Sequence, residues 1–193
     1  MVWVLNGFFL PWRVKMELLD LCLDRSVRVP ESKDLDMLLS WRNHDDVRRF
    51  MYTQHEISFD EHVRWFYSAL TNPKKCLLVY EEQQEPLGFA NLSISSDGKI
   101  ADWGFYLAPY APRGTGRHLG YCVLKHAFNT LNVHKVCGEA LAFNERSIGF
   151  HERLGFLREG ILRDQHYDGS SFVDVIRFGL LHTEWKQNTE GLK

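Results

Sequence analysis

The residues best suited to chemistry form a glycine-rich turn between an apolar segment and an amphipathic helix. Gly114 and Gly116 lie in the turn, and Arg113 and Arg117 flank it. Apolar residues then recur at helical spacing: Leu119, Val123, Leu124, Ala127, Phe128 and Leu131. Backbone N–H groups at the start of such a helix, backed by its dipole, favour phosphate oxygens. The turn predicts a phosphate-binding loop, with an ordinary solvent-exposed turn as the alternative.

A second polar segment begins at Asn144 and Ser147, which open a short helix carrying His151. The Asn144 amide can cap this helix or reach a ligand, and both can hold together. His151 has an ordinary pKa near ~6.5 and can donate or accept a proton, although a lone histidine on an amphipathic helix is usually structural. In the predicted strands, Glu139 can take up a proton and Ser93 can polarise a carbonyl group. The alternatives are an outward-facing carboxylate and a serine bonded to backbone.

Three further residues invite a metal site but do not support one. His118, Cys122 and His126 are spaced i, i+4 and i+8. Ligands spread over two full helical turns cannot converge on one ion about 2 Å from each. We therefore predict no metal site.

Composition excludes several classes of protein. The 193 residues, 45% of them hydrophobic, suit one domain, and the net charge of −2 is mixed along the chain, which argues against a nucleic-acid partner. Four separated cysteines without a C-x-x-C pair fit reduced thiols, so the cytoplasm is the expected compartment. No apolar run is long enough to span a membrane, so no membrane partner is expected. Residues 1–15 are interpreted as an N-terminal extension or a peripheral strand, and residues 16–193 as a single domain.

The elements that must position these residues alternate irregularly. Helical patterns cover 32–44, 47–51 and 58–72, and the third opens with a capping box of Ser58 and Glu61. Three hairpin-linked strands follow at 76–80, 87–94 and 100–107, then the glycine turn, its helix, a strand at 135–141, a helix at 147–154 and a hairpin over 156–181. This order predicts an α+β layer around one sheet. It differs from the regular βαβ alternation of dinucleotide folds, and the turn lacks the P-loop lysine.

Two segments together resemble the Gcn5-related N-acetyltransferase (GNAT) superfamily. Residues 113–118 are similar to its pyrophosphate loop, and residues 144–156 to its Asn-x-x-(Ala/Ser)-x-x-x-(Tyr/His)-x-x-x-Gly-Phe segment. The resemblance implies a GNAT-type fold, with a central mostly antiparallel sheet that splays at the cofactor site and is flanked by helices. It also implies acetyl-CoA as co-substrate, no metal, and direct transfer of the acetyl group to an amine.

The same resemblance implies which residues form the site. His151 stands where many members carry the tyrosine that protonates the leaving thiolate, and His118 stands where glycine or alanine is usual. The expected catalytic residues are His151, Glu139 and Ser93. The expected cofactor-binding residues are Tyr106, Leu107, Arg113, Gly114, Thr115, Gly116, Arg117, His118, Leu119, Asn144 and Ser147.

Within the superfamily, the segments around Trp41-Arg42-Asn43-His44 and Phe50-Met51-Tyr52 resemble the branch of ribosomal-protein and nucleotide-sugar acetyltransferases. This likeness implies a small-molecule acceptor, the 4-amino group of a UDP-linked amino sugar in pseudaminic acid biosynthesis for flagellin glycosylation. Arg42, Met51, Tyr52, His62 and Trp65 would bind it, although Met51 and Trp65 also fit the core. A ribosomal-protein-type N-terminal acetyltransferase and a non-catalytic acyl-CoA sensor are the alternatives. The sequence does not decide between a monomer and a homodimer.

Overall fold

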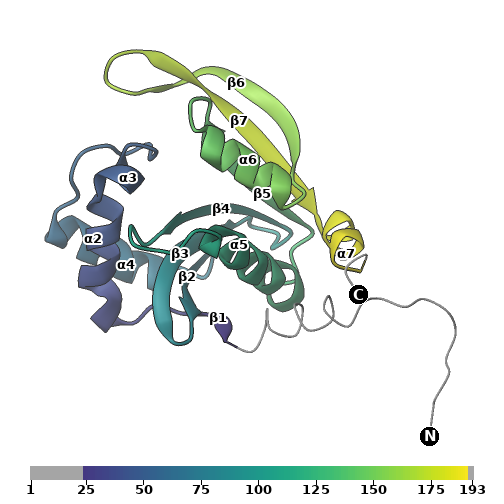
Figure 1. The fold of residues 1–193 in the computed structure, drawn as a ribbon, viewed down its shortest axis with the longest axis horizontal. Coiled ribbons are helices and arrows are strands. Elements are labelled where there is room, and N and C mark those ends of the chain that lie inside the picture. The colour runs from purple at the N-terminus through teal and green to yellow at the C-terminus, as the bar shows by residue number, and fades with distance from the viewer. Residues whose placement is uncertain (1–23, 191–193) are drawn as a thin grey trace, which may run out of the picture.

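A seven-stranded mixed sheet organises the molecule (Figure 1). The computed structural model describes residues 24–190, so the expected extension at 1–15 lies outside the described residues. The sheet order is β1-β2-β3-β4-β5-β7-β6, and every neighbouring pair is antiparallel except β4 and β5. The strands are β1 (Arg25–Arg28), β2 (Lys75–Glu82), β3 (Glu85–Ile94), β4 (Ile100–Leu107), β5 (Lys135–Leu141), β6 (Leu157–Tyr167) and β7 (Phe172–Leu181). The expected α+β architecture is confirmed.

Helices cover both faces of this sheet. They are η1 (Ser32–Asp34), α2 (Leu35–Asn43), α3 (Asp45–Arg48), α4 (Phe59–Thr71), α5 (Thr115–Lys125) with the π-helical η2 (His126–Thr130), α6 (Glu145–Arg153) and α7 (His182–Glu190). Side chains of a strand alternate between faces, and in β2 they separate two cores. Leu77 and Val79 join the cluster with α2 and α4, whereas Leu78 and Tyr80 join the cluster with α5.

The sheet opens between β4 and β5. These strands pair in parallel at three positions only, Ile100↔Lys135, Ala101↔Val136 and Asp102↔Cys137. Beyond them, β4 stays with β3 and β5 stays with β7. Aromatic rings gather beside the opening: Trp103 stacks on Phe156 with ring centroids 5.2 Å apart, and Phe105 contacts Phe150 of α6. The expected splay is therefore present.

The sequence predicted some features of the helices and missed others. Ser58 caps α4 as predicted, accepting a hydrogen bond from the Glu61 backbone N–H at 3.3 Å. The Glu61 carboxylate instead lies 3.3 Å from His55 Nε2, so only the serine half of the predicted capping box is present among the described residues. Helix α7 was not predicted, because Trp185 packs with Phe128 and Tyr121, contacts that a local pattern does not reveal. Within residues 24–190, no helix is long and apolar enough to cross a membrane.

Gly138 of β5 leaves no room for a side chain. A Cβ there would lie 2.5 Å from His151 Nε2 and 2.7 Å from Trp103 Nε1. Both atoms belong to buried rings that cannot swing away. We predict that Gly138→Ala lowers the free energy of unfolding by about 1–3 kcal/mol, measured by urea denaturation. Gly160→Ala is the control, because nothing lies within 4 Å of its added Cβ. Equal loss in the two variants would contradict this packing.

Candidate active site

The opening between β4 and β5 leads into a cavity of about 1200 Å³. One end is formed by the loop after β4 and the start of α5, the middle by β4, β5 and α6, and the other end by α3 and the loop that follows it. Its polar lining residues are Asp46, Tyr52, Asp102, Tyr106, Arg117, Glu139, Asn144, Arg146, Ser147, Arg153 and Arg177. The cavity therefore joins a basic end to an end that carries carboxylates.

The glycine turn forms the basic end. Gly114 is the N-cap of α5 and adopts φ 99°, a left-handed conformation that favours glycine. Gly114, Gly116 and Arg117 line the cavity, as do Tyr106, Leu107, Asn144 and Ser147 among the expected cofactor residues. Asn144 caps α6, its side-chain oxygen accepting from the Ser147 N–H at 3.0 Å.

The remaining expected cofactor residues do not line the cavity. Leu119 and Thr115 are buried residues of α5, and Arg113 lies outside the lining. His118 turns away, with its Nδ1 3.0 Å from Glu82 Oε1. Glu82 also accepts from the Tyr80 hydroxyl at 2.6 Å. The unusual side chain at position 118 therefore belongs to a polar cluster at the end of β2, and only its backbone stays with the turn.

Sequence reasoning missed two arginines of the cavity. Arg146 and Arg153 of α6 line it, as does Arg117 of α5. They are separated by two helical turns and so lie on one face of α6. This spacing is the feature of the sequence that could have identified them. Three guanidinium groups in one cavity, with the start of α5 also in its lining, favour an anionic ligand.

Four elements bring polar groups together at the other end. The Tyr52 hydroxyl, from the loop after α3, donates to Glu139 Oε2 of β5 at 2.5 Å. Arg177 of β7 donates to the other oxygen of Glu139 and lies 3.6 Å from Asp102 of β4. Burial, reinforced by the bond to Glu139, raises the pKa of Tyr52, so its phenol stays protonated at neutral pH. Asp102 and Arg177 were not singled out from sequence, because neither lies in a recognisable motif.

His151 lies in the core instead of the cavity. It is 1% exposed, stacks on Phe178 with centroids 4.6 Å apart, and is absent from the cavity lining. Its Nε2 lies 3.1 Å from the Trp103 indole N–H, which donates to it, and its Nδ1 lies 2.8 Å from the Ser147 carbonyl. Burial lowers its pKa to about 4. Both ring nitrogens are engaged, which leaves neither for a bound thiolate.

Ser93 and three expected acceptor residues also lie outside the lining. The Ser93 hydroxyl is 2.5 Å from Lys75 Nζ. Met51 and Tyr52 line the cavity, whereas Arg42, His62 and Trp65 do not. Arg42 donates to the Thr53 carbonyl at 2.8 Å, and His62 stacks under Trp65 with centroids 5.4 Å apart. Arg42 Nη1 and His62 Nε2 are buried and have no hydrogen-bond partner among residues 24–190.

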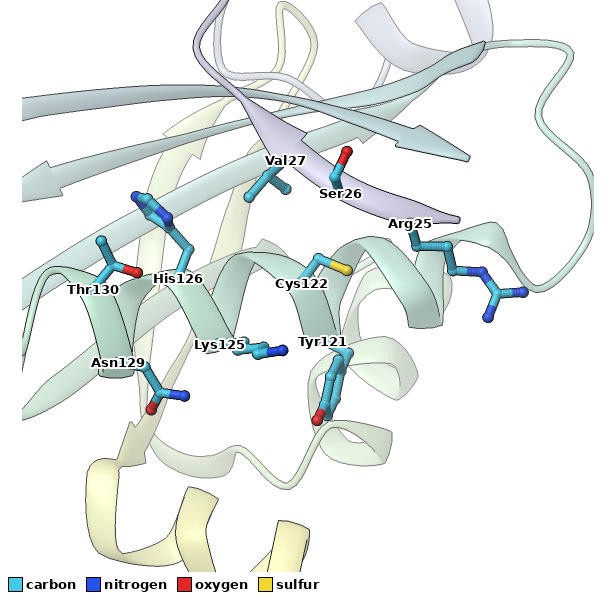
Figure 2. Close-up of a pocket in the computed structure, with 9 residues that line it drawn as sticks. All are labelled: Arg25, Ser26, Val27, Tyr121, Cys122, Lys125, His126, Asn129 and Thr130. Atoms are coloured by element: carbon cyan, nitrogen blue, oxygen red, sulfur yellow. The ribbon is translucent and has the colours of Figure 1, made fainter. Parts of the chain in front are cut away.

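A smaller hollow of about 250 Å³ lies between β1 and the α5–η2 helix (Figure 2). Arg25 at its edge pairs with Glu82 at 3.4 Å, and His126 Nε2 lies 3.7 Å from Cys76 Sγ. The residues that line it include no carboxylate to accept a proton. Among the described residues, no group of His, Cys, Asp and Glu could hold a metal ion. The large cavity is therefore the candidate active site.

The burial of His151 predicts acid sensitivity. Its pKa is about 4 in the folded protein and near ~6.5 in the unfolded chain, so the folded state binds fewer protons between these values. Stability is then fully present above about pH 6.5 and falls as pH drops toward 4, by on the order of 3 kcal/mol in total. We expect His151→Phe to lose less stability between pH 7 and pH 4.5 than the native chain, measured by denaturant titration. His55→Phe, at an exposed histidine, should keep the native acid sensitivity. An unchanged pH slope in His151→Phe would refute this assignment.

Comparison with known proteins agrees with the geometry. The family described as acetyltransferase (GNAT) domain matches residues 26–157. The prophage-derived uncharacterized N-acetyltransferase YokL of Bacillus subtilis is 29% identical over 148 residues, covering 75% of this chain and 83% of the relative. Acetyltransferase PseH of Campylobacter jejuni is 27% identical over 128 residues, covering 65% of this chain and 78% of the relative.

A solved structure shows the same fold. The spermidine N-acetyltransferase of Vibrio cholerae in complex with CoA and spermine superposes with a TM-score of 0.78 at 23% identity, covering 84% of this chain and 98% of that chain. The family match spans most of the chain, and the splayed sheet and glycine turn are those implied by the sequence resemblance. The chain therefore belongs to the GNAT family of acetyltransferases, enzymes that transfer an acetyl group from acetyl-CoA to an amine.

Proposed function

We propose that the enzyme acetylates the 4-amino group of a UDP-linked amino sugar in pseudaminic acid biosynthesis. The observation that carries this proposal is a pair of buried side-chain nitrogens, Arg42 Nη1 of α2 and His62 Nε2 of α4, which have no hydrogen-bond partner among residues 24–190 and lie outside the cavity lining. A buried donor left unpaired costs about 1–3 kcal/mol, and a nucleotide phosphate that reaches beyond the present lining would accept hydrogen bonds from these groups. The similarity to PseH supports the same acceptor class.

Acetyl-CoA would occupy the basic end and the middle of the cavity. Backbone N–H groups around Gly114 and Gly116 would hold the pyrophosphate, and the guanidinium groups of Arg117, Arg146 and Arg153 would neutralise the phosphates. The backbone of Tyr106 and Leu107 would lie beside the pantetheine arm, in the gap where β4 no longer pairs with β5. The thioester would then face Glu139.

Transfer would proceed by direct attack of the amine on the thioester. Glu139 would take the amine proton, since it lines the cavity and its side chain is partly exposed. Cys137 also lines the cavity, but burial raises the pKa of its thiol, which keeps it protonated and disfavours an acyl-enzyme. Met51 and Tyr52 would contact the sugar from the loop after α3.

A polyamine is the second candidate acceptor. Three carboxylates, Asp46, Asp102 and Glu139, line the cavity, and they would attract a cationic amine. The solved structure with TM-score 0.78 was obtained with spermine. Arg177 opposes this candidate, because its positive charge already offsets part of the negative charge of Asp102 and Glu139.

The acceptor class is tested by release of CoA from acetyl-CoA in the presence of a UDP-4-amino sugar, spermidine or a basic peptide. We expect the highest kcat/KM with the nucleotide sugar. Preference for spermidine would identify a polyamine acetyltransferase. Preference for the peptide would identify an N-terminal acetyltransferase. Acetyl-CoA binding without turnover on any amine would indicate a sensor.

Arg42 supplies a sharper test of the phosphate interaction. Loss of a charge-assisted bond of about 1.5 kcal/mol predicts that Arg42→Met raises the acceptor KM about tenfold for the nucleotide sugar. The free 4-amino sugar without its nucleotide should show no such change, because it has no phosphate. Arg163→Met, at an exposed residue of β6, is the matched control. The same KM increase with both acceptors would place the effect in the fold and not in phosphate binding.

A further inference from the structure

We propose that Tyr52 is the catalytic acid, that its hydroxyl protonates the leaving thiolate, and that Glu139 returns a proton to it. This inference rests on the proposed acetyl transfer and concerns how the same cavity performs it. It moves the proton donor from α6, where His151 stands, to the loop after α3. It also changes the role of Tyr52 from binding the acceptor to chemistry.

The first support is position. Tyr52 and Glu139 come from segments 87 residues apart, yet the hydroxyl donates to the carboxylate at 2.5 Å and both residues line the cavity. Glu139 lies on β5 beside the gap where its pairing with β4 has ended. A proton acceptor for the amine and a proton donor for the thiolate must both lie near the carbonyl carbon, and this pair places them together.

The second support is that the loop holding Tyr52 is anchored. Arg42 donates to the carbonyl of Thr53, the next residue, at 2.8 Å. Asn43 exchanges two hydrogen bonds with the backbone of Ile57, at 2.8 and 2.9 Å. The Tyr52 ring itself packs edge-on against His166, with centroids 5.1 Å apart. A catalytic group held at several points keeps its geometry through the reaction.

The third support is chemical state. Tyr52 is a proton donor before reaction, because a phenol has a pKa near ~10 and partial burial together with the bond to Glu139 raises the pKa of this one further. His151 is neutral, buried and bonded through both ring nitrogens, and it does not line the cavity. Tyr106 also lines the cavity, but its hydroxyl donates to the carbonyl of Leu38 in α2 at 3.4 Å. Tyr52 is thus the phenol directed at the carboxylate.

The proton balance closes without another reactant. The amine nitrogen attacks the thioester carbon, the C–N bond forms, and the C–S bond breaks with its electron pair going to sulfur. Glu139 takes the proton released by the nitrogen, and the Tyr52 hydroxyl gives its proton to sulfur. The Glu139 carboxyl passes a proton to the Tyr52 oxygen across their hydrogen bond in the same step, because a phenol with a raised pKa would not give its proton to a thiolate alone. Net transfer runs from a carboxylic acid to a thiolate, which is downhill because a thiol pKa near ~8.5 exceeds that of a carboxyl.

The test compares Tyr52→Phe, Glu139→Gln and the double variant, with Tyr67→Phe as the matched control. Tyr67 is an exposed tyrosine of α4 outside the cavity lining. Tyr52 is 51% exposed, so loss of its hydroxyl leaves the fold intact. We expect Tyr52→Phe to lower kcat about 10²-fold, with the acceptor KM and the acetyl-CoA Kd within about threefold of the native values. The double variant should be little slower than Glu139→Gln, because the two residues act as one unit.

Each outcome decides between roles. A raised acceptor KM with retained kcat in Tyr52→Phe would return Tyr52 to acceptor binding and overturn the relay. Additive losses in the double variant would also overturn it, since independent groups do not share a proton. If the native enzyme turns over and Tyr52→Phe has the same kcat as Tyr67→Phe, the proton relay from Glu139 through Tyr52 is refuted. The proposed function is then unaffected. Acetyl-CoA binding without turnover by the native enzyme on any amine would overturn both.

Discussion

The structure depends on one interrupted strand pairing. β4 and β5 share three residue pairs and then separate, while each keeps its other neighbour. Backbone groups that would have satisfied each other across this gap are left facing a cavity, which is costly unless a ligand or water takes their place. The gap persists because aromatic side chains of β4 and α6 pack beside it and because β7 holds β5 on its outer edge. Every candidate residue of the site is positioned relative to this opening.

The charges around the gap are arranged asymmetrically. Arg117 lines the glycine-turn end and Arg146 and Arg153 line the cavity from α6, and none of the three forms an ion pair within residues 24–190. At the other end Arg177 lies between Asp102 and Glu139, so this arginine is already compensated by carboxylates. An anionic cofactor is therefore favoured at the first end and not at the second. The same distribution leaves the amine side with carboxylates that can accept a proton and a phenol that carries one.

Sequence predicted the frame of this site better than its contents. The glycine turn and the Asn144 segment identified the fold, because each depends on residues close together in the sequence. The turn requires the left-handed backbone at Gly114, and the Asn144 segment requires a helix cap. Glu139 was found as a strand carboxylate, but its partners Tyr52 and Arg177 arrive from a distant loop and from β7. His151 could not be placed from spacing alone, since its direction is set by the missing Cβ at Gly138 and by the Trp103 indole. Pairings over long sequence separation carry no local signature.

The seam between the two parts of the sheet has a thermodynamic consequence. Residues of β1 to β4 form an antiparallel meander, β5 to β7 form a second antiparallel unit, and the backbone ladder joins them through three pairs. A molecule bound in the gap contacts both units at once and takes over part of the missing ladder. Its binding energy then adds directly to the cohesion of the sheet, rising with ligand concentration above the dissociation constant. The cofactor of such a fold therefore stabilises the contact between the two groups of strands in addition to reacting.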